Sequence, residues 1–390
     1  MKKFVSLVLA VLMVMTTLSL VSVASAETIK IGVLVSDATS SEALAFRSYY
    51  TDYLAPAYGV ELIYSDELVD AAGEKSAIDN FIVNNCKAVI SFSSFDRPAQ
   101  IDQCESAGVY YAVATGTLTD EQYAEYADYD YYIGAIGPSM TIEYQTGYDM
   151  AMHYLESGMK KFGMFSGGVP YYVDMHIYRA AGMLAALAEY TGTDYKGASG
   201  MAIVGQIYAD GAVETAVFGD VELMAVVGGY DFDDAWFGKL AQMATAEGIE
   251  VLLTVGSGVD VLGSFVSGTG VKLATVDSFT AAMGEAMNSG ILDYVAGKFA
   301  ASVGPIFAAC YKAVTGGEKL TDADGNALAL DQGYWIATSS EEFAQYSAVD
   351  SSSTDPAYTK DMLDANIGSF DEFAAFVAQY SFEAIAALKN

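Results

Sequence analysis

Hydroxyl, carboxylate and aromatic side chains recur in short clusters along the chain, and each cluster comes soon after an apolar run. From these clusters we expect the following residues to bind a ligand: Ser36, Asp37, Ser94, Phe95, Thr115, Tyr171, Tyr172, Tyr230, Phe232, Ser257 and Asp277. Ionised carboxylates accept short hydrogen bonds from sugar hydroxyls, and an aromatic ring covers the apolar C–H face of a sugar. The pattern therefore favours binding of a small polyhydroxylated molecule. For any one residue, an ordinary turn or helix cap is the alternative.

The same carboxylates leave a secreted glycoside hydrolase open as an alternative. Asp277 with Asp231 or Asp233 would form the required pair if two carboxyls lay about 5–10 Å apart across the scissile bond. No base or nucleophile is distinguished by its neighbours in the sequence. We therefore expect no enzymatic activity and no catalytic residue.

Motifs for metal, nucleotide or acyl-transfer chemistry are missing from the sequence. The only histidines, His153 and His176, fall within expected helices and have no partners at ligand spacing. The segment 256–258 lacks the third glycine of a dinucleotide fingerprint, and Ala327 replaces the required glycine in a segment from Asp322 that resembles a calcium loop. We expect neither a cofactor nor a metal ion.

The charge balance excludes polyanionic partners. The 390 residues include 50 acidic and 18 basic side chains, a formal net charge of −32, and no run rich in lysine or arginine. A field of this sign repels phosphate backbones, so we expect no nucleic acid partner. The hydrophobic fraction of 53% is large enough to build a substantial core.

The first 26 residues have the pattern of a secretory signal peptide. Lys2 and Lys3 precede an apolar stretch from Phe4 to Val23, and Ala24-Ser25-Ala26 fits a signal peptidase site. An uncleaved membrane anchor is the alternative. We expect cleavage after Ala26 and export to the periplasm or the cell exterior.

Three cysteines, Cys86, Cys104 and Cys310, form an odd set for an oxidising compartment, and no Cys-x-x-Cys motif occurs. Cys86 and Cys104 each stand shortly before an apolar segment of a neighbouring unit. The sequence therefore leaves a disulfide between these two residues open.

Short apolar segments alternate with longer stretches of helical periodicity, which is typical of parallel strands covered by helices on both faces. The expected strands are 29–35, 60–64, 88–92, 109–113, 131–136, 162–165, 201–207, 223–227, 251–255 and 272–276. The expected helices are 40–57, 74–84, 97–106, 140–156, 174–191, 235–247 and 259–267, with helices in the tail starting after Ser339 and Ser369, the last over 369–388. We interpret the acidic segment 119–129 as a loop. The polar clusters follow the carboxyl ends of the strands, where open α/β sheets bind ligands.

Several segments resemble the type I periplasmic binding proteins, the superfamily of ribose-binding protein, the ligand core of lactose-type repressors and the BMP family of nucleoside receptors. The matching segments are 29–35, 158–163, 178–183, 248–258 and 274–278, and the last two are closest to the BMP pattern. The resemblance implies that Asp277 holds ligand hydroxyls and that Phe232 stacks on a ring. It also implies that Arg179 binds the ligand, because Arg179 stands near the position at which sugar binders have a helix arginine that donates to ligand oxygens. Ser257 stands where sugar binders usually have asparagine.

The expected fold is α/β, with two doubly wound parallel-sheet lobes, a three-segment hinge and an extra helical C-terminal extension. Residues 27–135 and 298–333 would form lobe 1, and residues 136–297 and 334–390 would form lobe 2. The resemblance places the three crossovers near 133–138, 295–303 and 332–336. We expect the extension, from residue 338 onward, to pack on the second lobe.

The resemblance implies a monomeric solute-binding protein of an ABC-type importer. It would close on a sugar or nucleoside in the cleft between the lobes and present it to a membrane permease. One alternative is a ligand-sensing receptor for a sensor kinase, which differs in partner but not in pocket chemistry. The glycoside hydrolase is the alternative from another class.

Overall fold

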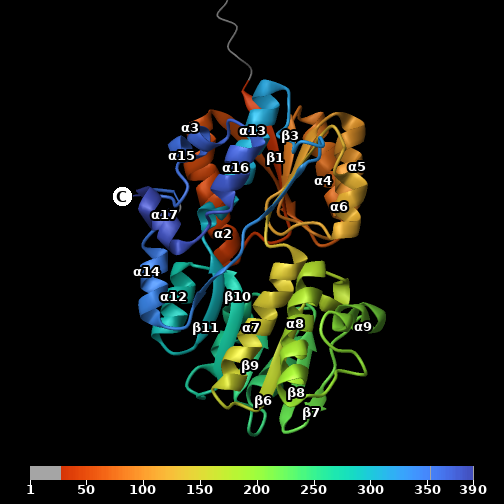
Figure 1. The fold of residues 1–390 in the computed structure, drawn as a ribbon, viewed down its shortest axis with the longest axis vertical. Helices are drawn as coiled ribbons and strands as arrows, with labels where there is room; N and C mark the ends of the chain where they lie inside the picture. Colours follow the sequence, from red (N-terminus) through yellow and green to blue (C-terminus); the bar gives the residue numbers. More distant parts are fainter. Residues whose placement is uncertain (1–27, 352, 390) are drawn as a thin grey trace, which may run out of the picture.

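The computed structural model describes residues 28–351 and 353–389, which form two lobes stacked along the long axis (Figure 1). The expected signal peptide, residues 1–26, lies outside the described residues. In the described part of the chain, no helix is both long and apolar enough to cross a membrane.

The first lobe is built on a six-stranded parallel sheet. Its strand order is β12-β5-β4-β3-β1-β2. The strands are β1 (Ile29–Val35), β2 (Val60–Glu67), β3 (Ala88–Ser91), β4 (Tyr110–Val113), β5 (Tyr132–Gly137) and β12 (Leu328–Asp331). Strands β3 and β5 are buried throughout, as expected for apolar strands covered on both faces.

The second lobe contains a seven-stranded sheet of order β13-β11-β10-β9-β6-β8-β7. The strands are β6 (Lys161–Gly167), β7 (Ala216–Phe218), β8 (Val221–Gly228), β9 (Val251–Thr254), β10 (Lys272–Ser278), β11 (Tyr294–Lys298) and β13 (Trp335–Ala337). The two edge strands, β7 and β13, are antiparallel to their neighbours, and the five central strands are parallel.

The helices of lobe 1 are α2 (Ser41–Ser48), which continues through a π-helical turn η1 (Tyr49–Leu54) into α3 (Ala55–Tyr58), then α4 (Ala71–Val83), α5 (Arg97–Ala107), α6 (Asp120–Tyr126), η3 (Ala300–Val303) and α13 (Gly304–Gly316). Lobe 2 contains α7 (Met140–Glu156), η2 (Val169–Tyr171), α8 (Asp174–Thr191), α9 (Ala202–Asp210), α10 (Asp234–Ala244), α11 (Gly258–Val266) and α12 (Ala281–Asn288). The tail contains α14 (Ser340–Ser347), α15 (Lys360–Asn366), α16 (Phe370–Val377) and α17 (Phe382–Lys389).

Side-chain oxygens define where many of these helices begin. At eleven helix starts in the described part of the chain an oxygen accepts the backbone N–H three residues later: Ser40, Asp70, Asp96, Thr119, Ser139, Asp233, Thr280, Ser339, Thr359, Ser369 and Ser381. Each cap satisfies a backbone donor that the first turn leaves free. The helix starts predicted after Ser339 and Ser369 are confirmed.

The chain passes between the two sheets three times, after β5, after β11 and after β12. These passages fall at or next to the three crossovers that the resemblance implied. The lobes are therefore joined by a three-segment hinge.

Two segment predictions were wrong. Residues 201–207 are not a strand, because Ile203, Val204 and Ile207 bury one side of helix α9, which ends at Gly211 in the left-handed region. The expected loop 119–129 contains helix α6. There Thr119 and Gln122 form a reciprocal capping box, which satisfies the backbone donors at the start of the helix.

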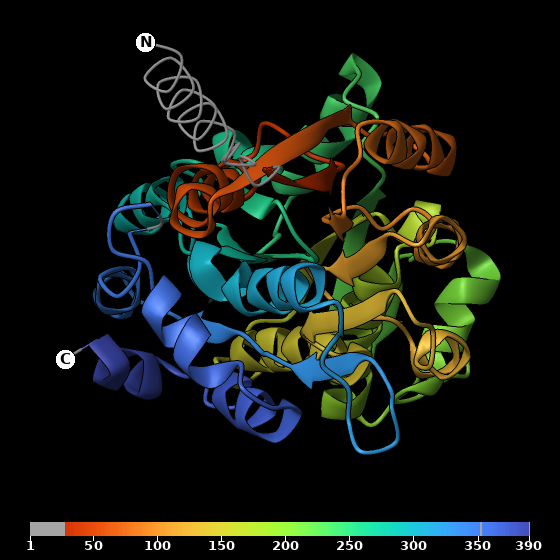
Figure 2. The same cartoon turned by 90° about the horizontal axis from the view of Figure 1, so that it is seen from above.

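The tail also differs from expectation. The predicted helix 369–388 is broken into α16 and α17. Its packing on the second lobe is only partial, because α14 contacts α12 and β13 of lobe 2, whereas α15 contacts α13 and α16 contacts β12 of lobe 1. Seen from above, the dark blue tail helices line one side of the molecule (Figure 2).

Helices α7 and α8 make a very close approach that the glycines permit. A Cβ on Gly147 would overlap the backbone oxygen of Arg179, and a Cβ on Gly182 would overlap that of Tyr144. The contact therefore brings the start of α7 against α8, where Glu143 meets Arg179.

Gly182→Ala should force the two helices apart and lower the free energy of unfolding by about 1–3 kcal/mol, the usual cost of overpacking. Gly205→Ala is the matched control, because Gly205 lies in helix α9 with open space around its Cα. That control should stabilise the protein by about 0.5–1 kcal/mol through helix propensity. Urea unfolding of both variants measures the difference, and equal effects would contradict the close approach.

The three cysteines are free and buried, so the disulfide that the sequence left open does not form. Burial raises the pKa of Cys86 to about 11 and that of Cys104 to about 12. Because the thiolate is the reactive form, alkylation at pH 8 without reductant should modify no cysteine in the folded protein and all three in guanidinium. Mass spectrometry counts the modified thiols, and fewer than three in guanidinium would contradict the free-thiol assignment.

Candidate ligand-binding site between the lobes

The carboxyl ends of the strands in the two lobes face one another. At the start of α2 in lobe 1, Glu42 Oε1 accepts a hydrogen bond of 2.7 Å from Ser278 Oγ at the end of β10 in lobe 2. Ser41 accepts a second bond across the lobes from Thr280, at 3.3 Å. The sheet edges therefore meet at one shared site.

Asp277 lies at the centre of this site. It is the penultimate residue of β10, its residue is only 6% exposed, and Oδ1 accepts the Ser278 N–H at 2.9 Å. Burial, together with the nearby Glu42 carboxylate, raises the pKa of Asp277 well above its usual range. A neutral hydroxyl that donates to this carboxylate would replace the water that burial removes.

Arg179, on α8, is held by the protein rather than left free. Its Nε and Nη2 donate to the two oxygens of Glu143 at 2.6 and 2.9 Å, and Nη1 donates to the Val255 carbonyl at 2.5 Å. The Tyr334 hydroxyl lies 2.7 Å from Nη2 and 3.0 Å from Glu143 Oε1. Each guanidinium nitrogen thus already has a protein acceptor.

Lys298 was not singled out from the sequence. It ends β11 beside the hinge and is 9% exposed, and its ammonium makes no hydrogen bond or ion pair within the described residues. Its Nζ lies 5.7 Å from the ring centre of Phe46 in lobe 1 and 5.8 Å from that of Tyr334. Burial lowers the pKa of Lys298, while Glu42 and Glu143 oppose that shift.

His176 is a neutral donor in this setting. Its Nδ1 accepts the Gly168 N–H at 2.8 Å, so the remaining ring proton is on Nε2. Desolvation and the Arg179 charge lower its pKa to about 3. The bond from Gly168 ties this ring to the turn that follows β6.

Tyr230 and Phe232 form an aromatic wall of lobe 2 at the edge of the site. The rings of Tyr230 and Phe232 stack with centres 6.0 Å apart, and Phe232 is 62% exposed. The Tyr171 hydroxyl accepts the Tyr230 N–H and donates to Asp231, both at 3.2 Å. These bonds hold the loop in place behind the exposed ring.

Three predicted site residues occupy the left-handed region although none is glycine. The φ angles of Tyr172, Phe232 and Ser257 are 59°, 53° and 55°. This conformation costs free energy for residues with a Cβ and is retained mainly where the surroundings require it. All three lie after strands of lobe 2 that end at the site.

A cavity of about 170 Å³ lies between residues of the two lobes. Its lining residues are Ser94, Phe95, Asp96, Arg97, Pro98 and Gln122 from lobe 1, and Tyr172, Val173, Asp174 and Met175 from lobe 2. The cavity brings together three residues predicted from distant parts of the sequence, namely Ser94, Phe95 and Tyr172.

The remaining predicted residues of lobe 1 form local contacts. Ser36 Oγ lies 3.4 Å from the Phe92 carbonyl, and the Asp37 carboxylate accepts the N–H groups of Thr39 and Ser40. The Thr115 carbonyl accepts a bond of 2.6 Å from Arg97. At the described site these residues stabilise the turns after β1 and β4.

Sequence reasoning missed four groups at the centre of the site: Glu42, Glu143, Lys298 and Tyr334. Glu42 and Glu143 lie in the first turns of helices, where an acidic residue is commonly explained by the helix dipole. Lys298 is the last residue of strand β11, and its position at a carboxyl end of a strand was the available signal. Tyr334 lies in the third hinge segment, and the course of that segment brings its hydroxyl to Arg179.

The free energy of unfolding of the wild-type protein should fall as the pH rises, and Asp277→Asn should reduce this fall. The folded-state pKa of Asp277 is above the unfolded value, so the folded state binds more protons and its stability falls as the pH rises toward the folded pKa. Urea unfolding between pH 5 and 8 should therefore show a smaller decline in the variant. The exposed Asp231 is the control, and an Asp277→Asn slope equal to that of Asp231→Asn would contradict the assignment.

Solved structures share this architecture. An ABC transporter solute-binding protein from Bacillus halodurans, with bound myo-inositol, is 18% identical over 83% of this chain and 99% of that chain, with a TM-score of 0.56. A periplasmic solute-binding protein from Actinobacillus succinogenes, with bound D-allose, is 14% identical over 82% and 100%, with a TM-score of 0.57. The transcription regulator CcpA of Lactococcus lactis is 14% identical over 80% and 100%, with a TM-score of 0.54.

No protein-family model matches the chain, and no curated protein matches it. Similarities at these identities show the fold alone. The predicted fold class is confirmed: the chain has the type I periplasmic binding protein fold, with two parallel-sheet lobes and additional C-terminal helices.

Proposed function

We propose that this protein is an exported solute-binding protein of an ABC-type importer that holds one small polyhydroxylated ligand between its lobes. The observation that carries the proposal is the interlobe bond from Ser278 to Glu42, which places two carboxylates, Glu42 and Asp277, where the lobes meet. A ligand that touches both lobes favours the closed arrangement, because the open arrangement offers it only part of these contacts.

The chemistry of the site favours a neutral sugar or polyol. Asp277 and Glu42 accept hydrogen bonds, and Lys298 and His176 supply donors. A hydroxyl group serves both kinds of partner. Arg179, the strongest candidate for an anionic ligand, is already paired with Glu143, so a carboxylate or phosphate would have no free guanidinium to bind.

The solved structures with bound myo-inositol and D-allose support a sugar-like ligand. A nucleoside, which the BMP-like segments predicted, stays a prediction. A receptor for a sensor kinase has the same pocket chemistry, and the two proposals differ in whether a permease or a kinase is the partner.

The glycoside hydrolase gains no support from the geometry of its proposed carboxylates. Asp233 caps helix α10 by accepting the Trp236 N–H at 2.7 Å. Asp231 accepts from Tyr171 at the aromatic wall. Both carboxylates are engaged in holding the loop and the helix start.

A panel of neutral sugars, polyols and nucleosides, screened by thermal unfolding and small-angle scattering, tests the proposal. We expect at least one member to raise the unfolding temperature and compact the protein, since a ligand at 100 times its Kd adds about 2.7 kcal/mol of stability. Asp277→Ala should abolish the response, and Asp220→Ala, at an exposed turn beside β8, should retain it.

Two outcomes would contradict the proposal. One is the absence of any response across the panel. The other is recovery of a cleaved sugar by NMR after incubation, which would favour the hydrolase. A response that Asp277→Ala retains in full would show that the ligand binds elsewhere.

A further inference from the structure

We propose that the C-terminal tail, residues 338–351 and 353–389, is a brace that favours the closed arrangement of the lobes even without ligand. It would act through the π-helical turn η1 and two of the three hinge segments. The inference rests on the hinge motion in the proposed function but not on the identity of the ligand.

The tail binds the hinge directly. The Tyr380 hydroxyl accepts the Phe299 N–H at 3.2 Å, and Asp350 Oδ2 accepts the Ala301 N–H at 3.1 Å. Both backbone donors belong to the segment that leaves β11 for lobe 1. The tail is therefore hydrogen-bonded to the second hinge segment at two points, one just before η3 and one within it.

Tail aromatic rings also enclose the third hinge segment. The ring of Trp335, the first residue of β13, has its centre 5.5 Å from that of Tyr346, 5.3 Å from that of Tyr380 and 5.8 Å from that of Phe382. A shift of this segment would have to repack three rings contributed by α14, α17 and the turn before α17.

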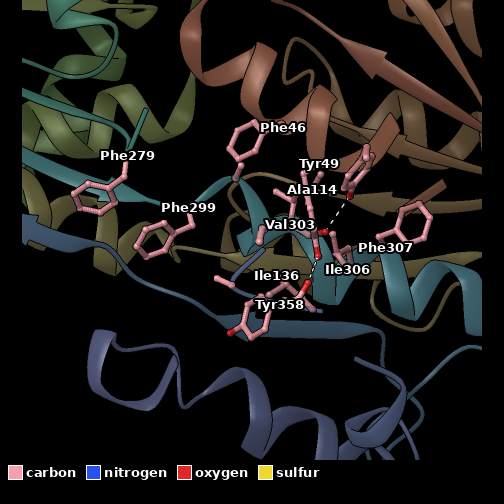
Figure 3. Close-up of a cluster of buried hydrophobic side chains, with 14 of the residues drawn as sticks. Phe46, Tyr49, Ala114, Ile136, Phe279, Phe299, Val303, Ile306, Phe307 and Tyr358 are labelled. Atoms are coloured by element: carbon pink, nitrogen blue, oxygen red, sulfur yellow. Dashed lines mark hydrogen bonds between the residues drawn. The ribbon is translucent and has the colours of Figure 1, made fainter. Parts of the chain in front are cut away.

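The π-helical turn attaches the tail to lobe 1. The Tyr49 hydroxyl donates to the Tyr358 carbonyl at 2.7 Å, and the Tyr53 hydroxyl accepts the Lys360 N–H at 3.0 Å. Figure 3 shows Tyr49 and Tyr358 approaching one another within the buried cluster that also includes Phe279 of lobe 2 and Phe299 of the second hinge segment. Short π-helical turns inside α-helices are rare overall, and those that occur often lie at functional sites.

Helix α2 connects these tail contacts to the ligand site. Its first turn carries Ser41 and Glu42, whose side chains bond Thr280 and Ser278 across the lobes. The same helical run continues into the π-helical turn that the tail holds. A displacement of the tail therefore moves the element that supplies Glu42 to the cleft.

Opening the lobes would have to disrupt one set of tail contacts. The tail packs on α12 and β13 of lobe 2 through α14, and on α13 and β12 of lobe 1 through α15 and α16. These contacts belong to one buried hydrophobic cluster that spans both lobes. The closed arrangement is thereby favoured before binding, which raises the apparent affinity by increasing the fraction of binding-competent protein.

The brace can be tested in the unliganded protein by measuring the distance between the lobes. Spin labels at Val83→Cys in lobe 1 and Val217→Cys in lobe 2 use side chains that are 84% and 70% exposed, whereas the native cysteines are buried. Tyr49→Phe removes the bond to Tyr358. Tyr111→Phe is the matched control. It also removes the hydrogen bond of a buried tyrosine, but the partner is Gln100 in lobe 1 and not a residue of the tail.

We expect Tyr49→Phe and Tyr111→Phe to lower the unfolding temperature by a few degrees each, but only Tyr49→Phe to shift the distance distribution toward longer values. Tyr53→Phe, at a partly buried position, is a milder second variant and should shift the distribution in the same direction. An unchanged distribution in both tail variants, or an equal change in Tyr111→Phe, would overturn the brace. A silent ligand panel would count against the proposed function and would leave the unliganded distances unaffected.

Discussion

The rest of this structure depends on one constraint: the charged side chains that are buried where the two lobes meet need partners. Glu143 and Arg179 satisfy each other, and Tyr334 and the Val255 carbonyl take up further donors and acceptors. Removing one partner of such a pair typically costs about 3–5 kcal/mol. Within the described residues, Asp277 accepts only the Ser278 N–H and Lys298 contacts only aromatic rings, so the proposed hydroxyl-rich ligand would add hydrogen-bond partners to both.

The two parts of this network depend on backbone packing. The pair between Glu143 and Arg179 exists because Gly147 and Gly182 let α7 and α8 approach closely. The unsatisfied part lies beside the hinge, where β10 and β11 end and α2 begins. The pair between Glu143 and Arg179 is thus held by two closely packed helices, whereas Asp277 and Lys298 lie beside the hinge segment that the tail also contacts.

Much of the fold could be predicted, because apolar periodicity and caps are local properties. Helices 140–156 and 174–191 agree with α7 and α8 residue for residue, and strand 29–35 agrees with β1. Prediction failed at 201–207, where β-branched residues suited a strand but their spacing buried one helix face. It also failed in the tail, whose hydrophobic faces matched either lobe, so that the choice between lobes depended on contacts with α13 and β12.

The sequence by itself determined the class of chemistry: carboxylates, hydroxyls and rings after parallel strands, with no nucleophile, metal motif or basic surface. It also predicted that Asp277, Tyr230 and Ser257 lie at or just after the carboxyl ends of strands, because the direction of a parallel strand sets which end its loop occupies. The tertiary structure alone decided that Arg179 is paired with Glu143, that the Lys298 ammonium contacts the Phe46 and Tyr334 rings, and that Cys86 and Cys104 stay apart. Pairing and desolvation depend on which residues distant in sequence share a buried volume, and no local pattern encodes that.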